Sequence, residues 1–495
     1  MKNGAAEYLA AAFHRMYPKA VPLSGSASNH AFFYDFLISE KISKKDLSFI
    51  DEAMHALCKE KAKRYEMLGE NAAAFLREMG EAAKAKTAER YTGRLIYIFQ
   101  LGGFFDVCLE DFHLDMESLA FKIQEYEDRG SVVKNKKDYF CIRIIGYAFS
   151  SSEILQDYLK EVKTFHKYSH NVLGEKLGIF SVHYRAGIKE FLWKNRGESF
   201  LHLLEDFWRS HMKCLGYSLS ASLPEDFPQK PNKHFWNELK KERKLWSPLI
   251  VALKGEKKWA EPDRSSNASL FELAKECIDR VYILCFSVEM KRQKENLEKA
   301  IKDFFHLLSI PIEFTSGAEK KRRFSNKGKE PFKENYGREE DSGRNIYFTD
   351  SYGQKQRLGF IRCHKLPEEE VLLEASFIHS FERLAAALLE TWRGGLPFWL
   401  APEQLRILPM VEDPEIFTLQ KNLLSKNFRV DIDCSRQSLK EKIKEAQKVK
   451  VPFLLIFGKN EQEKRTALIQ NSSGEKQEIP LEKLAHWLEI KQITR

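Results

Sequence analysis

The sequence predicts a multidomain protein of mixed α and β structure. At 495 residues the chain is too long for one ordinary domain, and its 43% hydrophobic and 12% aromatic content suffices for packed cores. The N-terminal third mixes helical and strand patterns. After Glu390, short strands alternate with helices of about ten residues, a pattern typical of a compact βαβ domain with a largely parallel sheet.

Within the N-terminal third, Glu7 to Met16 has helical periodicity, and AFFYDFLI reads as a strand. An amphipathic helix is expected to begin near Ser43 and to cover residues 44–68. Strands are expected on both sides of the Gly102–Gly103 turn, and YFCIRIIGYAF is expected to form a buried strand. Ser151 or Ser152 can cap the helical segment that follows.

The middle of the chain predicts a helix between Gly197 and Gly216 and a polar interruption over 317–343. Six basic residues and no acidic one lie between Lys320 and Lys329. We interpret the interruption as a mobile loop, because charge runs are usually solvated. A phosphate-binding tail is the alternative.

The composition limits the classes of function. A formal net charge of +9 permits an RNA partner, although many enzymes are mildly basic. No apolar stretch approaches the roughly 20 residues of a membrane span, and Met1 to Tyr17 lacks signal-peptide features, so we expect a cytoplasmic protein without membrane contact. The eight cysteines form no C-x-x-C pair, and no Walker A, G-x-S-x-G or H-E-x-x-H pattern occurs.

Several segments resemble one family in its own order. LPFWLAPEQLRIL, FRVDID, EKIKEAQKVKVPFLLIFGKNE and LEKLAHWLEI resemble the anticodon-binding domain of class II aminoacyl-tRNA synthetases, and most of all that of threonyl-tRNA synthetases. YLAAAFHRMYPKA, FFDVC and RIIGYAFSSSEILQDYLKE resemble the editing domain of that family. WKNRGESFLHLLEDFWRSHMKCLGY, SPLIVALKGEKKWAEP and IHSFERLAAALLE resemble its catalytic motifs 1, 2 and 3.

The resemblance implies a domain order. We expect an editing-like α+β domain over 1–150, a linker helix over 151–180, a class II antiparallel-sheet catalytic-like domain over 181–392, and an α/β anticodon-binding-like domain over 393–495. The family's N-terminal ubiquitin-like domain is expected to be absent. Family members dimerise through the class II core, and the helix from Phe200 to Tyr217 keeps an apolar face, so a homodimer is predicted.

The activation site implied by the resemblance has lost residues. Glu261 and Arg383 keep motif 2 and motif 3 positions, and Arg383 could still hold ATP. Trp259 stands where motif 2 has an arginine, and a second motif 2 arginine falls near Ala274. Because paired guanidinium contacts stabilise phosphate charge, these losses predict that aminoacylation is lost.

The family's zinc ligands are also replaced. Its two histidine positions fall at Tyr282 and near Glu374, and the segment that supplies its cysteine is deleted. A catalytic zinc site needs three protein ligands. No zinc or other metal site is therefore expected.

The editing-like site is incomplete in the same way. Glu7 and Ala11 stand where the family has two histidines, while Cys108 is kept and His113 lies five residues after it. Cys108 and His113 could act as nucleophile and base. A packed cysteine beside a loop histidine is the alternative.

RNA binding is the function that the resemblance leaves most intact. The candidate RNA-binding residues are Arg436, Lys440, Lys442, Lys444 and Glu461. The cations can hold phosphates without reading bases, or they can simply solvate a helix face. Trp392, Phe398 and Trp399 could stack on bases, but packing at a domain junction is the simpler interpretation.

Three functions follow from these patterns. The first is a non-catalytic protein that binds tRNA or a synthetase-type partner. The second is a divergent but active threonine–tRNA ligase. The third is an aminoacyl-tRNA hydrolase that uses Cys108 and His113.

Overall fold

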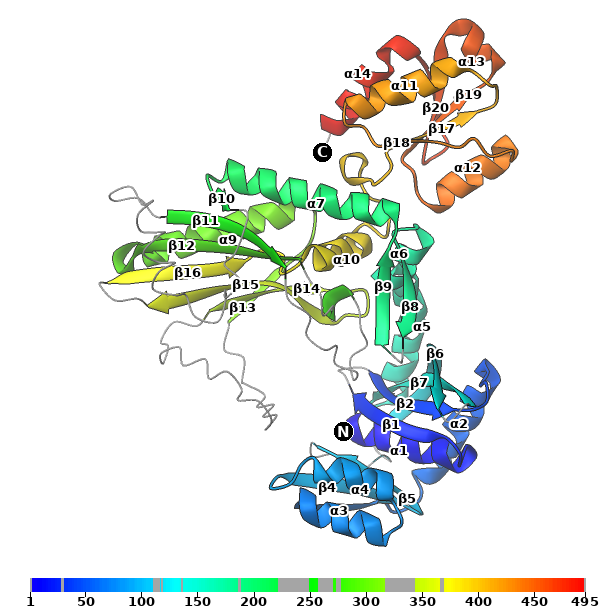
Figure 1. Cartoon of the computed structure of the whole chain (residues 1–495), viewed down its shortest axis with the longest axis vertical. Coiled ribbons are helices and arrows are strands. Elements are labelled where there is room, and N and C mark those ends of the chain that lie inside the picture. The colour runs from blue at the N-terminus through cyan, green and yellow to red at the C-terminus, as the bar shows by residue number, and fades with distance from the viewer. Residues whose placement is uncertain are drawn as a thin grey trace. The chain divides into compact units, whose positions relative to one another are not determined.

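The computed structural model describes residues 2–27, 31–109, 116, 119–134, 137–185, 188–220, 249–256, 270–272, 277–316, 343–365 and 369–493. The chain forms two compact units (Figure 1). Unit 1 contains Met1–Thr164 and His183–Glu190, and unit 2 contains Phe165–Val182 and nearly all of the chain after Phe191. The predicted loop over 317–343 lies almost wholly outside the described residues.

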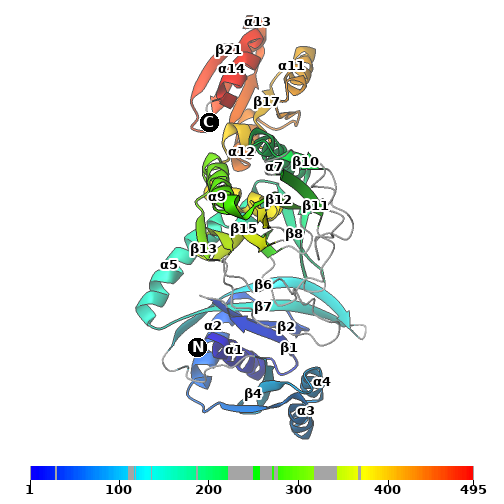
Figure 2. The ribbon, with the colours of Figure 1, turned by 90° about the vertical axis from the view of Figure 1, so that its left-hand side faces the viewer.

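Unit 1 is built on a four-stranded antiparallel sheet. Two helices cover one face of this sheet (Figure 2). The strand order is β1 (Val21–Ala27), β2 (Ala31–Ile38), β7 (Lys137–Phe149) and β6 (Ala120–Lys134), and the helices are α1 (Lys2–Met16) and α2 (Lys44–Leu57). A smaller layer packs beside them, made of β3 (Lys63–Leu68), β4 (Leu95–Leu101), β5 (Phe104–Cys108), α3 (Gly69–Glu78) and α4 (Ala82–Glu89).

The helix predicted over 44–68 is shorter than expected. It begins after Ser43, whose backbone N–H donates to the Asp46 carboxylate at 2.6 Å, but it ends at Leu57. Lys63–Leu68 instead forms β3 and pairs antiparallel with β4. The sequence prediction failed there because charged residues fit both a helix surface and an exposed edge strand.

Unit 2 contains a seven-stranded sheet that is antiparallel except for its first pair. Its order is β10 (Ser218–Ser220), β11 (Leu249–Glu256), β12 (Cys277–Phe286), β16 (Glu370–Ser376), β15 (Lys355–Lys365), β14 (Arg344–Thr349) and β13 (Glu313–Ser316). One shared core joins this sheet to α7 (Asn195–Cys214), α9 (Met290–Leu307) and α10 (Phe381–Thr391). The predicted antiparallel-sheet core is therefore confirmed.

The linker between the two parts of the chain consists of more than one element. The predicted helix over 151–180 forms α5 (Ser152–Tyr168) and α6 (His170–Lys176), and the hairpin of β8 (Phe180–Arg185) and β9 (Ile188–Trp193) follows. The Ser151 hydroxyl accepts the N–H of Ile154 at 3.3 Å, as the capping prediction expected.

The C-terminal region is a five-stranded α/β sheet with helices on both faces. The strand order is β18 (Val430–Ile432), β17 (Leu405–Pro409), β19 (Phe453–Phe457), β20 (Thr466–Asn471) and β21 (Lys476–Pro480). α12 (Leu439–Lys448) packs on one face, and α11 (Pro414–Ser425) and α14 (Leu481–Ile493) pack on the other. The first three strands are parallel as predicted. β20 and β21 are antiparallel, because a tight turn with Gly474 at φ 90° joins them.

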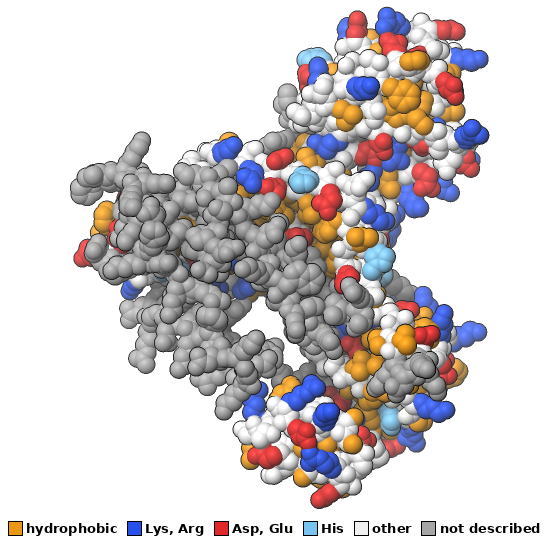
Figure 3. Space-filling view, viewed as in Figure 1, with side chains coloured by type: hydrophobic (Ala, Val, Ile, Leu, Met, Phe, Trp, Pro, Cys, Tyr) orange, Lys and Arg blue, Asp and Glu red, His pale blue; other side chains and the backbone are white. Residues whose placement is uncertain are grey.

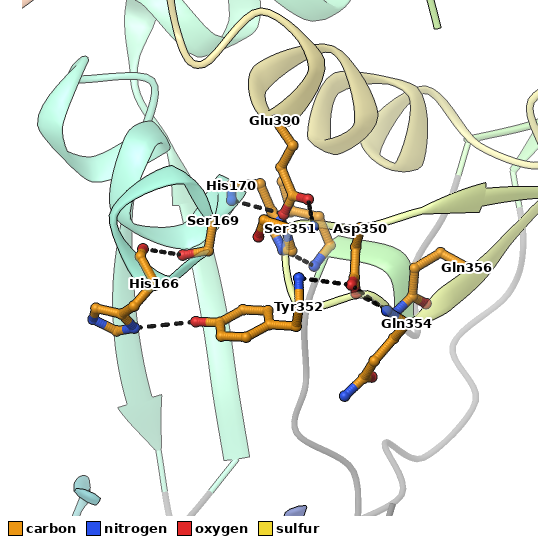
Figure 4. A network of polar contacts seen from close by, with 10 residues as sticks. His166, Ser169, His170, Asp350, Ser351, Tyr352, Gln354, Gln356 and Glu390 are labelled. Atoms are coloured by element: carbon orange, nitrogen blue, oxygen red, sulfur yellow. Dashed lines mark hydrogen bonds and ion pairs between the residues drawn. The ribbon is translucent and has the colours of Figure 1, made fainter. Parts of the chain in front are cut away.

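A buried hydrogen-bond network, which we call the Glu390 network, connects distant segments of unit 2 (Figure 4). Glu390, near the end of α10, accepts hydrogen bonds from the backbone N–H of His170 at 3.0 Å and of Ser351 at 2.6 Å. It also accepts one from His170 Nδ1 at 2.7 Å, while Leu270 N donates to His170 Nε2 at 3.3 Å. These contacts correspond to a neutral imidazole with its proton on Nδ1.

Substitution of Glu390 by glutamine should destabilise unit 2 without creating a cavity. The glutamine amide nitrogen is a donor, so at least one of the three N–H groups that face Glu390 would lose its acceptor. We expect Glu390→Gln to lower the free energy of unfolding by about 2–3 kcal/mol in a urea titration. Asp157→Asn, in the exposed α5 pair with Lys160, is the control and should change it by less than about 0.5 kcal/mol. Equal effects of the two variants would contradict the role given to Glu390.

Candidate functional site

The start of α10 is positioned by a buried carboxylate. Asp279 on β12 is fully buried and accepts hydrogen bonds from Ser376 Oγ at 2.6 Å and from the N–H of Phe377 at 2.7 Å. Ser380 then caps α10, because its hydroxyl accepts the N–H of Arg383 at 3.1 Å. Arg383 is thereby fixed in the first turn of the helix, where sequence analysis placed a residue for ATP.

The Arg383 guanidinium is engaged by the protein. Its Nη1 donates to the carbonyl oxygen of Arg357 on β15 at 3.0 Å, and the side chain is partly buried. A guanidinium that already donates to a backbone carbonyl has fewer donors for phosphate oxygens. Glu261, Trp259 and Ala274 lie outside the described residues, so their arrangement around Arg383 stays a prediction.

Tyr282 and Glu374, which the resemblance places at or near the family's zinc-binding histidines, are neighbours in space. Tyr282 on β12 pairs directly with Glu374 on β16. Glu374 lies 3.1 Å from His364 Nε2 and 3.5 Å from Arg280 Nε. Although burial opposes its ionisation, the hydrogen bond to His364 and the charge of Arg280 bring the Glu374 pKa below its ordinary value.

This donor set does not fit zinc. A tyrosine and an ion-paired glutamate replace neutral imidazoles, and the guanidinium beside Glu374 repels a divalent cation. Among the described residues, no group of three histidine, cysteine or carboxylate side chains is arranged to hold a metal ion. The chemistry that zinc would supply to the family's threonine pocket therefore has no counterpart in these residues.

Unit 1 contains a buried acidic cluster between α1, β2 and β5. The Tyr34 hydroxyl donates to one Asp106 oxygen, and the backbone N–H of Val107 donates to the other at 2.8 Å. The Glu7 carboxyl is a hydrogen-bond partner of both Asp106 and the Cys108 thiol. Ala11, one turn further along α1, is buried in the apolar core and contributes no polar group.

The surroundings of Cys108 oppose nucleophilic chemistry. Burial raises the pKa of its thiol well above the usual range, and the charges of Glu7 and Asp106 raise it further. Because the thiolate is the nucleophilic form, these surroundings favour the packed-cysteine alternative. His113 lies outside the described residues, so the predicted pairing with Cys108 stays a prediction.

The carboxyl pair in this cluster can hold a proton. Burial raises the pKa of Glu7 well above its ordinary value, and the nearby Asp106 carboxylate adds to the effect. A protonated Glu7 can donate to Asp106, so that the two carboxyl groups share one proton. Glu7 Oε2 accepts no hydrogen bond from any residue that the structure describes.

Sequence analysis identified Glu7 and Cys108 but missed Asp106 and Tyr34. The signal for Asp106 lay in FFDVC, because residues two apart on a strand share a face. Phe104 and Cys108 pack in the core beside α1, whereas Phe105 packs in the core beside α3 and α4. Asp106 therefore lies on the same face as Cys108.

The predicted RNA-binding residues divide into exposed and buried groups. Arg436 precedes α12, and Lys440 and Lys444 lie one turn apart on it; all three are exposed. Lys442 is only 3% exposed, and its ammonium donates to the Asp433 carbonyl at 2.8 Å. It therefore stabilises the segment after β18 from a buried position. Across the visible face of this region, basic and acidic side chains are interspersed (Figure 3).

The contacts of Glu461 and of the three aromatic residues are defined, while an RNA-binding role of Glu461 stays a prediction. Glu461 accepts the N–H of Gly458 at 2.8 Å and so caps α13 (Lys459–Lys464). Trp392 Nε1 donates to the Leu308 carbonyl at 3.2 Å, and the rings of Phe398 and Trp399 pack against other aromatic rings. These aromatic residues serve packing, as the simpler interpretation held.

Comparisons with known proteins agree with this fold. The family model described as "Anticodon binding domain" matches residues 404–491. The threonine–tRNA ligase of Helicobacter acinonychis is 24% identical over 99% of this chain and 91% of its own length. That of Acetivibrio thermocellus is 26% identical over 94% of this chain and 84% of its own length. The crystal structure of the RNA binding domain of threonyl-tRNA synthetase from Cryptosporidium parvum superposes with a TM-score of 0.56 at 15% identity, covering 66% of this chain and 99% of that one.

The antiparallel-sheet core and the C-terminal α/β domain are those of an aminoacyl-tRNA synthetase-like protein with an anticodon-binding domain. More particularly, the chain is a divergent homologue of threonine–tRNA ligases over nearly its whole length. Within the described ranges, every helix is too short or too polar to cross a lipid bilayer.

The acidic cluster predicts a pH-dependent effect of Glu7→Gln. Because its pKa is raised, the Glu7 carboxyl is still protonated in the folded protein at pH values at which the same carboxyl is already ionised in the unfolded chain. The wild type therefore loses stability as the pH rises from about 4.3, the unfolded pKa, through the folded pKa. Glutamine carries no such penalty, so Glu7→Gln should raise the melting temperature relative to wild type by a few degrees more at pH 8 than at pH 5.

Thermal unfolding followed by circular dichroism at the two pH values measures this difference. Glu52→Gln, at an exposed position on α2, is the matched control, and its effect should be the same at both pH values. A Glu7→Gln effect that is equally independent of pH would contradict the assignment of a shared proton.

Proposed function

We propose that this chain is a threonyl-tRNA synthetase-like protein that binds tRNA and has lost aminoacylation. The observation that carries the proposal is the state of Arg383, the arginine that the resemblance places in motif 3. Arg383 Nη1 donates a hydrogen bond to the Arg357 carbonyl oxygen and so links the start of α10 to β15. This N–H group is therefore not free to bind a ligand. Because each charged contact to a developing phosphate charge contributes about 3 kcal/mol in a dry site, the further loss at Trp259 should slow activation by about two orders of magnitude.

The amino-acid pocket supports the same conclusion. Tyr282 and Glu374 do not fit the zinc ion that the family resemblance implies, and the guanidinium of Arg280 beside them repels a metal cation. Glu374 is already paired with Arg280 and His364.

ATP–pyrophosphate exchange tests the loss of activation. The full-length chain, incubated with ATP, threonine and labelled pyrophosphate, should give no exchange above a reaction without protein, because the motif 2 arginine and the zinc ligands of the family are both replaced. An active threonine–tRNA ligase under the same conditions is the positive control. The same preparation must bind tRNA, which separates lost chemistry from misfolding. Threonine-dependent exchange would instead support a divergent but active ligase, the activity named for the homologues.

The anticodon-binding domain supports the tRNA-binding part of the proposal. Arg436, Lys440 and Lys444 form an exposed basic group, which we call the α12 cations. Glu441 lies among them, but its carboxylate accepts the backbone N–H of Ser438 at 2.9 Å, so it is held at the helix start. Exposed cations on one side of the domain bind phosphates by releasing counterions, without reading the bases.

Removal of the α12 cations should weaken tRNA binding and its dependence on salt. The triple variant Arg436→Gln, Lys440→Gln and Lys444→Gln loses up to three phosphate contacts, so the slope of log K against log salt should fall by about 2–3. Filter binding of tRNA between 50 and 200 mM salt, roughly the range in which phosphate contacts weaken most, measures both effects.

The matched control removes three lysines from the opposite face of the domain. Lys421 belongs to α11, Lys426 is the C-cap of that helix and Lys483 belongs to α14, and all three are exposed. Their replacement by glutamine changes the net charge equally. If both triple variants weaken binding alike, the effect is one of net charge and the α12 cations are not the contact surface.

We also propose the domain boundaries 1–150, 151–180, 181–392 and 393–495 and a homodimer. The matched anticodon-binding segment, 404–491, supports the last boundary. In α7, the large apolar residues Phe200, Leu204, Trp208 and Met212 pack into the core of their own unit. A dimer must therefore use other residues of this domain, and sedimentation of the full chain measures whether it forms.

A further inference from the structure

Four cations at the C-terminal ends of four helices gather in one region of unit 2. Lys167 lies in the last turn of α5 and Lys176 in the last turn of α6. Arg393 and Lys450 directly follow the C-cap residues of α10 and α12. All four residues are exposed and belong to unit 2. We call them the helix-end cations.

The contacts of these residues bring their charges close together. The Arg393 guanidinium carbon lies 4.7 Å from the centroid of the Tyr168 ring, and Lys167 Nζ lies 5.4 Å from the same centroid. The Lys450 ammonium donates to the backbone carbonyl oxygen of Arg393. Partial desolvation, and then the charges of Lys176 and Lys167, lower the pKa of Lys450. The positive charges are therefore close enough to repel one another.

No carboxylate neutralises the helix-end cations within the part of the chain that the structure describes, because none of the four forms an ion pair there. The acidic residues that are closest in sequence have other partners. Glu175 accepts the backbone N–H of Val182 at 2.9 Å, and Glu445 lies 3.9 Å from the ammonium of Lys448. The group thus has a net positive charge that the neighbouring side chains leave uncompensated.

The backbone of Arg393 and Lys450 adopts a conformation that favours glycine. Their φ angles are 48° and 54°. In each case the next N–H, that of Gly394 or Val451, donates back to the last turn of the helix, at 2.8 and 3.1 Å. The residue at this helix-ending position is most often glycine, because a Cβ atom makes left-handed backbone unfavourable. Backbone strain of this kind is characteristic of functional positions.

A role in helix stability explains only part of this arrangement. A cation at a helix C-terminus complements the helix dipole, but that role does not require four helix ends to bring their charges together. A compact anion with several charges would relieve the repulsion. Linked phosphates carry several charges within the space of one nucleotide, whereas a nucleic acid strand carries one charge per nucleotide. The compactness of the group therefore favours linked phosphates over an RNA backbone.

We propose that the helix-end cations bind a small ligand that carries two or more linked phosphate groups. Arg393, held against the Tyr168 ring, donates the N–H groups on its edge to phosphate oxygens, and the three lysines supply further positive charge. The site goes beyond the proposed function, because it uses neither Arg383 nor the α12 cations.

Calorimetric titration of the full-length chain with sodium tripolyphosphate tests the proposal, with sulfate at equal ionic strength as the comparison. Tripolyphosphate should bind at least about tenfold more tightly than sulfate, because only linked phosphates can contact several of the cations at once. Equal affinities would overturn the proposal. The triple variant that lacks the α12 cations should bind tripolyphosphate as wild type does. Loss of binding in that variant would assign the anion to the proposed tRNA surface and overturn the separate site.

Glycine variants distinguish a ligand site from a role in helix stability. Arg393→Gly and Lys450→Gly each remove a cation and relieve the left-handed backbone. Tripolyphosphate binding should therefore weaken by about tenfold in each variant, the loss expected for a charge-assisted contact, while the melting temperature is not lowered.

Arg465→Gly is the matched control, because Arg465 is also exposed and has φ 55°, but it lies at the end of α13. This variant should bind tripolyphosphate as tightly as wild type. Equal binding by Arg393→Gly and Arg465→Gly would overturn the proposal. So would a lowered melting temperature with unchanged binding in the Arg393 and Lys450 variants, which is the result expected if those cations only complement helix dipoles.

Discussion

The arrangement of unit 2 depends on one buried carboxylate that lacks a cationic partner. Glu390 is held in the core by N–H donors from three sources: the His170 backbone, the His170 ring and the Ser351 backbone. An ionised group can remain buried only if its oxygens are fully hydrogen-bonded. Since those donors come from α6 and from the turn after β14, neither segment can move without leaving the carboxylate unsatisfied. The same constraint fixes the end of α10, while Asp279 and Ser380 fix its beginning.

A rigid scaffold explains how the fold can persist while site residues change. The contacts that hold the sheet and α10 use Asp279, Ser380 and Glu390, and none of them touches the face where Tyr282 and Glu374 lie. A substitution on that face changes the charge exposed there without removing a buried partner. The substitutions are nevertheless coupled to one another, because Glu374 is stable on a partly buried surface only with Arg280 and His364 beside it.

Periodicity predicted most elements, and it failed where partners distant in sequence decide the outcome. Alternation and helical spacing located β2, β5, β7 and α7, and Ser43 was identified as the start of α2. Lys442 was expected on the surface because a lysine in a charged helix is usually solvated. It is buried because the Asp433 carbonyl, at the end of a neighbouring strand, needs a donor. Likewise, nothing in the local sequence of Glu7 indicates Asp106, which lies about a hundred residues away and meets it only through the packing of α1 on β5.

The surroundings of Cys108 and of Arg383 show why retained residues do not imply retained chemistry. Cys108 is kept from the family pattern, yet two carboxyl groups beside it hold the thiol in its protonated form. Arg383 is kept as well, yet a backbone carbonyl takes one of its donors. In each case the side chain has the right identity, but the free energy of its reactive form is set by its neighbours. Glu7 is such a neighbour of Cys108, because it raises the pKa of the thiol, and the Arg357 carbonyl is such a neighbour of Arg383, because it accepts one of its N–H groups. Activity therefore depends on those neighbours at least as much as on the retained residues.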